Sequence, residues 1–373
     1  MQSLSVNAPG RINLIGEHTD YNGGFVMPAS IQMATTVHLE KRTDKEIHLF
    51  AEDLQESYTF NVETISKSST DWANYIIGVI AQFQKIVTIP IGFNLRLKSN
   101  VPIGAGLSSS AAIECAVAVA INELFAFGID RMELTYIAQK AEHEYAGVQC
   151  GIMDQFASMF GKKDQVILLD CQSMHYQYYP LVLENYDIVL IDTQIKHALA
   201  SSEYNARRKE CELGILQIQK TYASVQSLRE VTMAMLNECI DQTAMPLVYK
   251  RCKYVIQEIE RTQSAAKDLQ ENQLVAFGQK MFATHYGLSE LYEVSCPELD
   301  FLVKEVEANP NVLGARMMGG GFGGCTINLI KKEATASVVQ KLVASYQNTF
   351  QKTLVHYIVS IEDGAGLFPS VSI

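Results

Sequence analysis

Residues 101–112 read Val-Pro-Ile-Gly-Ala-Gly-Leu-Ser-Ser-Ser-Ala-Ala, a run of small residues between an expected strand and an Ala-rich expected helix. Small residues let several backbone N–H groups approach one anion, and the N-terminus of the following helix adds partial positive charge. Taken alone, the segment fits a serine N-cap after a glycine turn even better, because such caps are common. It is not a P-loop, since no lysine follows the glycines. We call it the glycine–serine loop.

The segments on either side of this loop mix strands and helices without a regular alternation. Strands are expected where β-branched and apolar residues gather or alternate: 31–41, 47–53, 91–97, 165–170, 188–192, around 316, 326–330 and 354–360. Helices are expected at 72–87, at 108–160 with breaks near Gly128 and Gly147, at 201–220, over most of the chain from there to 307, and at 333–346. This mixture favours an α+β fold over a doubly wound sheet.

Composition excludes several classes of function. The chain has 373 residues, enough for two domains, and a formal charge of −11, which argues against a nucleic-acid partner. No apolar run approaches the ~20 residues of a membrane-spanning helix, so no membrane partner is expected. We also expect no secretory signal, because no basic patch precedes an apolar core near residue 1. The eight cysteines are scattered, which favours reduced thiols in the cytoplasm.

A second unusual segment, the first motif, reads Ala8-Pro-Gly-Arg-Ile-Asn-Leu-Ile-Gly-Glu-His-Thr-Asp-Tyr-Asn-Gly-Gly24. It reads as a turn-rich stretch that gathers Arg11, Glu17, His18 and Asp20. Such a cluster could bind a polyol, because each buried sugar hydroxyl needs a donor or an acceptor. A solvated loop is an equally good interpretation of these residues alone.

The third segment, Gly319-Gly-Gly-Phe-Gly-Gly-Cys-Thr326, matches the letters of a dinucleotide-binding fingerprint. That fingerprint requires a helix directly after the glycines. Residues 325–330 read instead as a strand, so a glycine-rich turn between two strands is the better interpretation. An NAD-binding protein is therefore disfavoured. We call this segment the glycine hairpin.

Together the three segments resemble those of the GHMP small-molecule kinases. The first motif resembles the galactokinase signature, the glycine–serine loop resembles the superfamily's phosphate loop, and the glycine hairpin resembles its third motif. They occur in family order over nearly the whole chain. The resemblance implies a two-lobed α+β GHMP kinase fold with the active site in the cleft between the lobes. We place the N-terminal lobe at 1–180 and the C-terminal lobe at 181–373.

The resemblance to galactokinases implies ATP-dependent phosphorylation of the anomeric hydroxyl of galactose, giving galactose 1-phosphate and ADP. This reaction is the first step of galactose catabolism by the Leloir pathway. The resemblance further implies Mg²⁺ as cofactor, ATP as co-substrate and a monomer. Two alternatives stay open: a kinase for N-acetylgalactosamine or a uronic acid, and a non-catalytic sensor of galactose and ATP. Ser110, Ala111 and Asp154 are intact, which favours an enzyme over a sensor.

The resemblance also assigns roles to single residues. Asp154 would accept or orient the proton of the sugar hydroxyl, and Arg11 would pair with it and stabilise charge on the transferring group. The sugar is assigned to Glu17, His18, Asp20, Gly151 and Tyr204. The ATP phosphates are assigned to Gly104, Ala105, Gly106, Leu107, Ser108, Ser109 and Ser110, and the magnesium ion to Ser110 and Glu142. Taken alone, Asp154 could instead be a helix cap, Glu142 a solvated carboxylate and Tyr204 a packing residue.

Overall fold

Within residues 2–195 and 200–368, which the computed structural model describes, the strands form three sheets. The six-stranded sheet has the order β13 (Gly366–Phe368), β1 (Ser3–Asn13), β3 (Pro28–Lys41), β6 (Phe93–Ser99), β4 (Glu46–Ala51) and β5 (Glu56–Asn61). The four-stranded sheet has the order β10 (Val312–Met317), β11 (Cys325–Lys331), β9 (Tyr186–Asp192) and β12 (Val355–Val359). The smallest sheet has the order β2 (Phe25–Val26), β7 (Gln165–Asp170) and β8 (Tyr176–Pro180).

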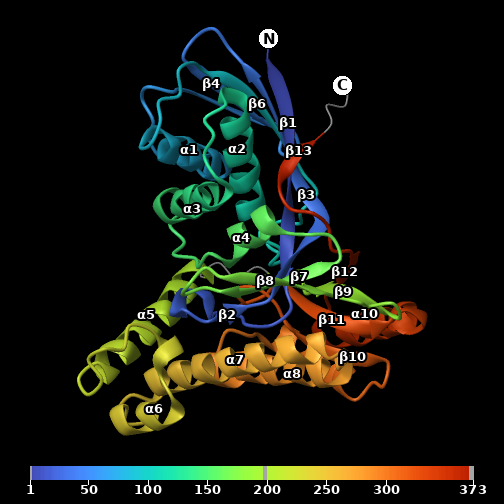
Figure 1. Cartoon of the computed structure of the whole chain (residues 1–373). Helices are drawn as coiled ribbons and strands as arrows, with labels where there is room; N and C mark the ends of the chain where they lie inside the picture. Colours follow the sequence, from blue (N-terminus) through green and yellow to red (C-terminus); the bar gives the residue numbers. More distant parts are fainter. Residues whose placement is uncertain (1, 196–199, 369–373) are drawn as a thin grey trace.

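The helices fall into two groups along the chain. The first group is α1 (Asp71–Gln84), α2 (Ser109–Phe125), α3 (Arg131–Ala141) and α4 (Met153–Phe160). The second is α5 (Ala200–Ile218), α6 (Met233–Cys239), α7 (Pro246–Gln270), α8 (Leu274–Tyr286), α9 (Pro297–Glu307) and α10 (Thr335–Phe350). Figure 1 shows α1, α2 and α3 beside the six-stranded sheet and α7 and α8 at the other end of the molecule. None of the helices described is long and apolar enough to cross a membrane.

Helix α2 carries the end of the glycine–serine loop against the six-stranded sheet. It packs on β1 and β3, and most of the side chains of its alanine-rich sequence are buried. Small side chains let a helix approach its neighbours closely, so an apolar surface on all sides fits a fully buried helix. The N-terminus of α2 is therefore fixed on a rigid support.

Strand β1 corrects the expectation that the first motif is turn-rich throughout. Residues 8–13 belong to this strand, and the irregular part begins only at Leu14. The pairing of β1 with β3 shifts register between Pro9 and Arg11: Gly10 alone lies opposite residues 31–33, so the bulge is in β3. A Cβ atom on Gly10 would lie 2.7 Å from the carbonyl oxygen of Leu107, and the Arg11 N–H donates to that oxygen at 3.1 Å. Because Gly10 has no side chain, β1 lies close to Leu107, and the backbone of Arg11 bonds to the glycine–serine loop.

Most of the expected elements are present, with shifts at their ends. The strand expected at 31–41 is β3, the breaks near Gly128 and Gly147 are confirmed, and the glycine hairpin joins β10 to β11 as expected. The helix expected at 72–87 ends at Gln84. Strands β1, β2, β5, β8 and β13 were not expected; β13 pairs with β1 although it comes from the end of the described chain. The lobe division at residue 180 stays a prediction.

One apolar core joins the first motif to the glycine hairpin. Ile12 and Leu14, at the end of β1 and just after it, share a buried cluster with Ile327 and Leu329 of β11. These side chains are fully buried. Removing this much apolar surface from water holds the two motifs together, at about 25 cal/mol per Å² of buried apolar area.

Candidate active site

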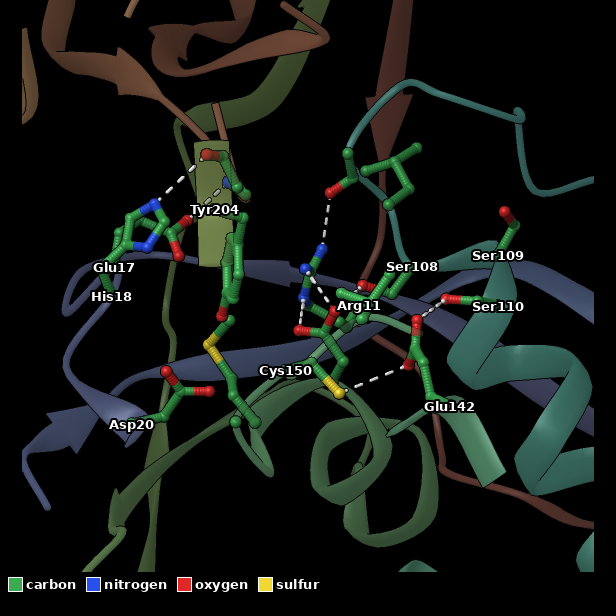
Figure 2. Close-up of a pocket in the computed structure, with 18 of the residues that line it drawn as sticks. Arg11, Glu17, His18, Asp20, Ser108, Ser109, Ser110, Glu142, Cys150 and Tyr204 are labelled. Atoms are coloured by element: carbon green, nitrogen blue, oxygen red, sulfur yellow. Dashed lines mark hydrogen bonds and ion pairs between the residues drawn. The ribbon is translucent and has the colours of Figure 1, made fainter. Parts of the chain in front are cut away.

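The glycine–serine loop, the first motif and the glycine hairpin meet at one cavity of about 260 Å³ (Figure 2). Its lining holds nearly every residue to which the sequence assigned a role: Arg11, Glu17, His18, Asp20, Gly104, Gly106, Leu107, Ser108, Ser109, Ser110, Glu142, Gly151, Asp154 and Tyr204. Ala105 is the exception, because its side chain is buried in the core below the loop. Val148, Cys150 and Met153 also line the cavity, although the sequence assigned them no role.

Arg11 and Asp154 form an ion pair at the centre of this lining. Arg11 Nε donates to Asp154 Oδ1 at 2.7 Å and Nη2 donates to Oδ2 at 2.8 Å, while Nη1 donates to the Gly106 carbonyl at 2.6 Å. Ser108 Oγ also donates to Asp154 Oδ2. Burial alone would lower the pKa of Arg11, but the Asp154 carboxylate raises it above its ordinary value. Asp154 lies in the first turn of α4 and does not cap it, so the capping alternative is wrong.

Ser110 and Glu142 lie together on the other side of the glycine–serine loop. Ser110 Oγ donates to Glu142 Oε1 at 3.0 Å, and Gln155 Nε2 donates to Oε2 at 2.7 Å. Glu142 begins a π-helical turn and is buried, so the solvated-carboxylate alternative is wrong. Burial and the nearby Asp154 charge raise the pKa of Glu142 to about 7. In the part of the chain that the structure describes, no group of three or more His, Cys, Asp or Glu side chains is arranged to hold a metal ion.

Glu17 joins the first motif to the glycine hairpin. Its Oε1 accepts hydrogen bonds from Nη1 and Nη2 of Arg316, both at 3.1 Å, and from the N–H of Gly319 at 2.7 Å. Arg316 is fully buried on β10, and its Nε donates to the Leu14 carbonyl at 2.9 Å. A buried cation next to a buried carboxylate is stable only with such hydrogen bonds. The Glu17 carboxylate is therefore held from the far side by the C-terminal part of the chain.

Asp20 and Gly151 are in direct contact. A Cβ atom on Gly151 would lie 1.8 Å from Asp20 Oδ2, so only glycine fits at this position. Burial, with the negative charge of Asp154 adding to it, raises the pKa of Asp20 to about 7. Backbone N–H groups of Tyr21 and Met153 bond to this carboxylate and oppose the rise.

His18 is held among aromatic rings on the same side of the cavity. Its backbone is left-handed, with φ of 61°. Nδ1 lies 2.7 Å from the hydroxyl of Tyr21 and Nε2 lies 3.2 Å from the Gly320 carbonyl. The ring centroids of Tyr292 and Tyr204 lie 4.9 Å and 5.2 Å from that of His18. Burial lowers the pKa of His18 to about 4, so the ring is neutral at neutral pH.

The segments that contain the three motifs match models of known protein families. Residues 2–41 match the galactokinase galactose-binding signature, residues 74–162 match the GHMP kinases N terminal domain, and residues 265–348 match the GHMP kinases C terminal domain. The chain is 44% identical to a galactokinase of Thermotoga maritima over 97% of this chain and 99% of that protein. The chain belongs to the galactokinase family. A galactokinase of Clostridium beijerinckii is 41% identical over 96% of this chain and 92% of that one.

Solved structures place the chain in the GHMP kinase fold, as expected from the sequence. The galactokinase of Lactococcus lactis, solved in complex with galactose, superimposes with a TM-score of 0.94 and 36% identity. The match covers 98% of this chain and 95% of that one. Mevalonate kinase of Methanococcus jannaschii superimposes over 97% of this chain and 99% of its own, with a TM-score of 0.67 and 17% identity, which shows the fold alone.

The residues that sequence reasoning missed in this galactokinase-family site are those that hold the expected ones in place. Arg316 holds Glu17, and Glu258 accepts from the N–H of Gly16 at 2.9 Å. Gln155 bonds to Glu142 and, at 3.0 Å, to the buried Glu114. Arg316 offered one signal, because an arginine within an apolar strand needs a buried partner.

Proposed function

We propose that the chain transfers the γ-phosphoryl group of ATP to the anomeric hydroxyl of galactose, giving galactose 1-phosphate and ADP, the first step of the Leloir pathway. One observation carries the proposal: the galactokinase signature and the glycine–serine loop face one cavity, with the Arg11–Asp154 pair at their junction. Galactokinase relatives that match over nearly the whole chain support galactose over N-acetylgalactosamine or a uronic acid as the acceptor.

Asp154 would orient the anomeric hydroxyl and take up its proton. Two nitrogens of Arg11 and the hydroxyl of Ser108 donate to its carboxylate and fix its orientation. Phosphoryl transfer through a loose transition state demands little proton removal at the start, so positioning the hydroxyl is the larger contribution. Arg11 would also stabilise negative charge on the transferring group.

The glycine–serine loop would bind the ATP phosphates through its backbone. Gly104, Gly106 and Ser108 have left-handed φ values of 82°, 75° and 57°, so the loop curls over the N-terminus of α2. A concave run of N–H groups at a helix N-terminus is a general anion-binding arrangement. Ser109 and Leu107 complete the lining, whereas Ala105 would contribute only its backbone.

Ser110 and Glu142 would hold a magnesium ion. Their oxygens lie 3.0 Å apart at the cavity wall, and both are the hard oxygen donors that Mg²⁺ prefers. Two protein ligands suffice for an ion that takes its other ligands from phosphate and water. When bound, the ion would neutralise charge on the phosphate oxygens. Glu142 would then be ionised, with Gln155 holding its second oxygen.

Galactose would lie on the side formed by the first motif and α5. Glu17, His18, Asp20 and Tyr204 line this side, and Gly151 gives Asp20 the room to reach it. A site whose buried polar groups bond to particular hydroxyls rejects a sugar that leaves them unpaired, often by ~10⁴-fold. We therefore propose that the acidic cluster of the first motif makes the site prefer the axial O4 hydroxyl of galactose over an equatorial one.

We further propose that the enzyme acts as a monomer in the cytoplasm, with lobes at 1–180 and 181–373. The eight cysteines are free thiols, which suits a reducing compartment. Both proposed lobes would contribute to the cavity lining, since Tyr204, Gly319 and Gly320 come from the second part of the chain and the other lining residues from the first.

The test of the activity is ADP release with Mg·ATP and a panel of galactose, glucose, N-acetylgalactosamine, galacturonate and mevalonate. We expect galactose-dependent ADP release that Asp154→Asn abolishes. Turnover with another sugar but not with galactose would show that the enzyme is a kinase for that other sugar. No turnover with any acceptor, while galactose still raises the melting temperature, would identify a sensor and refute the proposed activity.

A further inference from the structure

An unbroken chain of hydrogen bonds runs from the cavity wall to the middle of α5. His18 Nε2 lies 3.2 Å from the Gly320 carbonyl oxygen, and Nδ1 lies 2.7 Å from the Tyr21 hydroxyl (Figure 2 shows the first contact). The Tyr21 hydroxyl lies 2.8 Å from that of Tyr292, which lies 3.3 Å from the Cys211 thiol. Each group inside this series of hydrogen bonds therefore has two partners, and the Gly320 carbonyl and the Cys211 thiol are its two ends.

The groups at the two ends of this series of hydrogen bonds determine which group is the donor in each bond. A carbonyl oxygen only accepts, so the proton of His18 is on Nε2. The neutral ring then leaves Nδ1 as an acceptor, and the Tyr21 hydroxyl donates to it. The Tyr21 oxygen accepts from Tyr292, and Tyr292 accepts from Cys211, because each hydroxyl has one proton. Burial raises the pKa of Cys211 to about 12, so its proton is present.

The groups around His18 suit a neutral ring. Arg207 and Arg316 lower its pKa, while Glu17 raises it by less than burial lowers it. Tyr292 and Tyr204 pack against the ring and fix its orientation. A ring fixed in this way can bond to Gly320 only if the proton is on Nε2.

The bond from His18 complements the one made by its neighbour. Glu17 accepts from the N–H of Gly319, and His18 donates to the carbonyl of Gly320. Adjacent residues of the first motif thus bind adjacent residues of the glycine hairpin with opposite polarity. Gly320 in turn lies against the ring of Tyr204. With the proton on Nδ1, the Nε2 lone pair would face the Gly320 oxygen and this link would be lost.

We propose that Tyr21, oriented by Tyr292, is a positioning residue: it keeps the His18 proton on Nε2, so that His18 ties the first motif to the glycine hairpin and holds the sugar side of the cavity in shape. The kinetic consequence rests on the proposed function, whereas the position of the proton does not.

The test compares Tyr21→Phe with Tyr249→Phe. Tyr249 is a matched control, because its buried hydroxyl on α7 donates to Asn237 Oδ1 at 2.7 Å, in the same apolar cluster as Tyr292. Long-range ¹H–¹⁵N correlation of the histidine rings, with His18 assigned by His18→Gln, reads the proton position directly. We expect a protonated Nε2 and a hydrogen-bonded, unprotonated Nδ1 in the parent protein and in Tyr249→Phe. In Tyr21→Phe we expect Nδ1 to lose its hydrogen bond and part of the Nδ1-protonated form to appear.

The KM values for galactose and ATP distinguish a loss of positioning on the sugar side from a general loosening of the active site. In Tyr21→Phe we expect the KM for galactose to rise about threefold to tenfold, as for the loss of one buried hydrogen bond, with the KM for ATP within about twofold. Tyr292→Phe should act in the same direction, and the double variant should be no worse than Tyr21→Phe alone because the two act in series. If Tyr21→Phe does not fold, Tyr292→Phe provides the same readouts.

Three results would overturn the proposal: a proton on Nδ1 or a charged His18 ring in the parent protein at pH 7, an equal rise in both KM values, or spectra of Tyr21→Phe identical to those of the parent. Failure of the proposed galactokinase activity would give a different result from failure of the proposed role of Tyr21. In that case the parent protein releases no ADP with galactose while its histidine spectrum shows the expected proton position.

Discussion

Replacing Gly151 with alanine tests how closely Asp20 and the backbone just before α4 fit together. The new Cβ atom would lie 1.8 Å from Asp20 Oδ2, whereas ordinary contacts begin at 3.4 Å. The carboxylate must therefore move by roughly 1.5 Å, and a misplacement of about 1 Å at a reacting site can cost ~100-fold in rate. We expect kcat/KM for galactose to fall about 100-fold, equivalent to ~2.7 kcal/mol of transition-state stabilisation.

The assay is steady-state ADP release, with kcat/KM measured for galactose and the KM for ATP measured separately. Gly366→Ala is the control, because a Cβ atom there meets nothing within 4 Å. We expect this control to stay within about twofold of the parent. The KM for ATP should change little in Gly151→Ala, since the displaced carboxylate lies on the sugar side.

A double variant decides whether the contact with Asp20 is the cause. In an Asp20→Ala background the carboxylate is already gone, so adding Gly151→Ala should lower kcat/KM by no more than about twofold. A second 100-fold fall in that background would refute the reasoning, because the damage would then come from another effect of the methyl group. Activity of Gly151→Ala close to that of the parent would refute it as well.

Three further predictions concern charge and metal. Arg316→Met leaves Glu17 buried without its cation, so the free energy of unfolding in urea should fall by about 3–5 kcal/mol; an unchanged urea midpoint would contradict the ion pair. Because the pKa of Asp20 is raised to about 7, the folded state binds more protons than the unfolded state between about pH 4 and 7. Stability should therefore fall as pH rises across that window, and Asp20→Asn should weaken this fall; equal slopes would count against it. Glu142→Gln should weaken Mn²⁺ binding measured by electron paramagnetic resonance at least tenfold, and Ser110→Ala less, while unaltered binding would remove both from the metal site.

Whereas the lining residues came from the family resemblance, local patterns predicted most of the elements, because strand alternation and helical spacing depend on near neighbours in the sequence. They also showed that the glycine hairpin is not a dinucleotide loop, since the strand after it can be read from residues 325–330. The roles of individual residues came from the resemblance of whole motifs. The lining around Asp154, Arg11 and Ser110 forms as that resemblance implies, whereas the roles themselves stay predictions.

The parts that could not be predicted depend on contacts between distant segments. Glu17 and Arg316 are 299 positions apart, and no periodicity signals such a pair. The close approach of Gly10 to Leu107 also depends on two separate segments of the chain meeting. The chain of hydrogen bonds from His18 to Cys211 likewise joins the first motif to two helical segments. A sequence pattern gives the residue types but not which of them meet.

The pairing of β1 with β13 has a consequence during synthesis on the ribosome. Ser5 and Asn7 lie opposite Phe368 and Gly366, so among the described residues this edge of the six-stranded sheet is covered by a strand made about 360 positions later. At roughly 5–20 residues per second, the edge stays bare for about 20 to 70 seconds after β1 emerges. An uncovered strand edge is a template for pairing with another chain. The nascent protein is therefore most exposed to aggregation in that interval, and removing residues 366–368 would extend the exposure to the life of the finished protein.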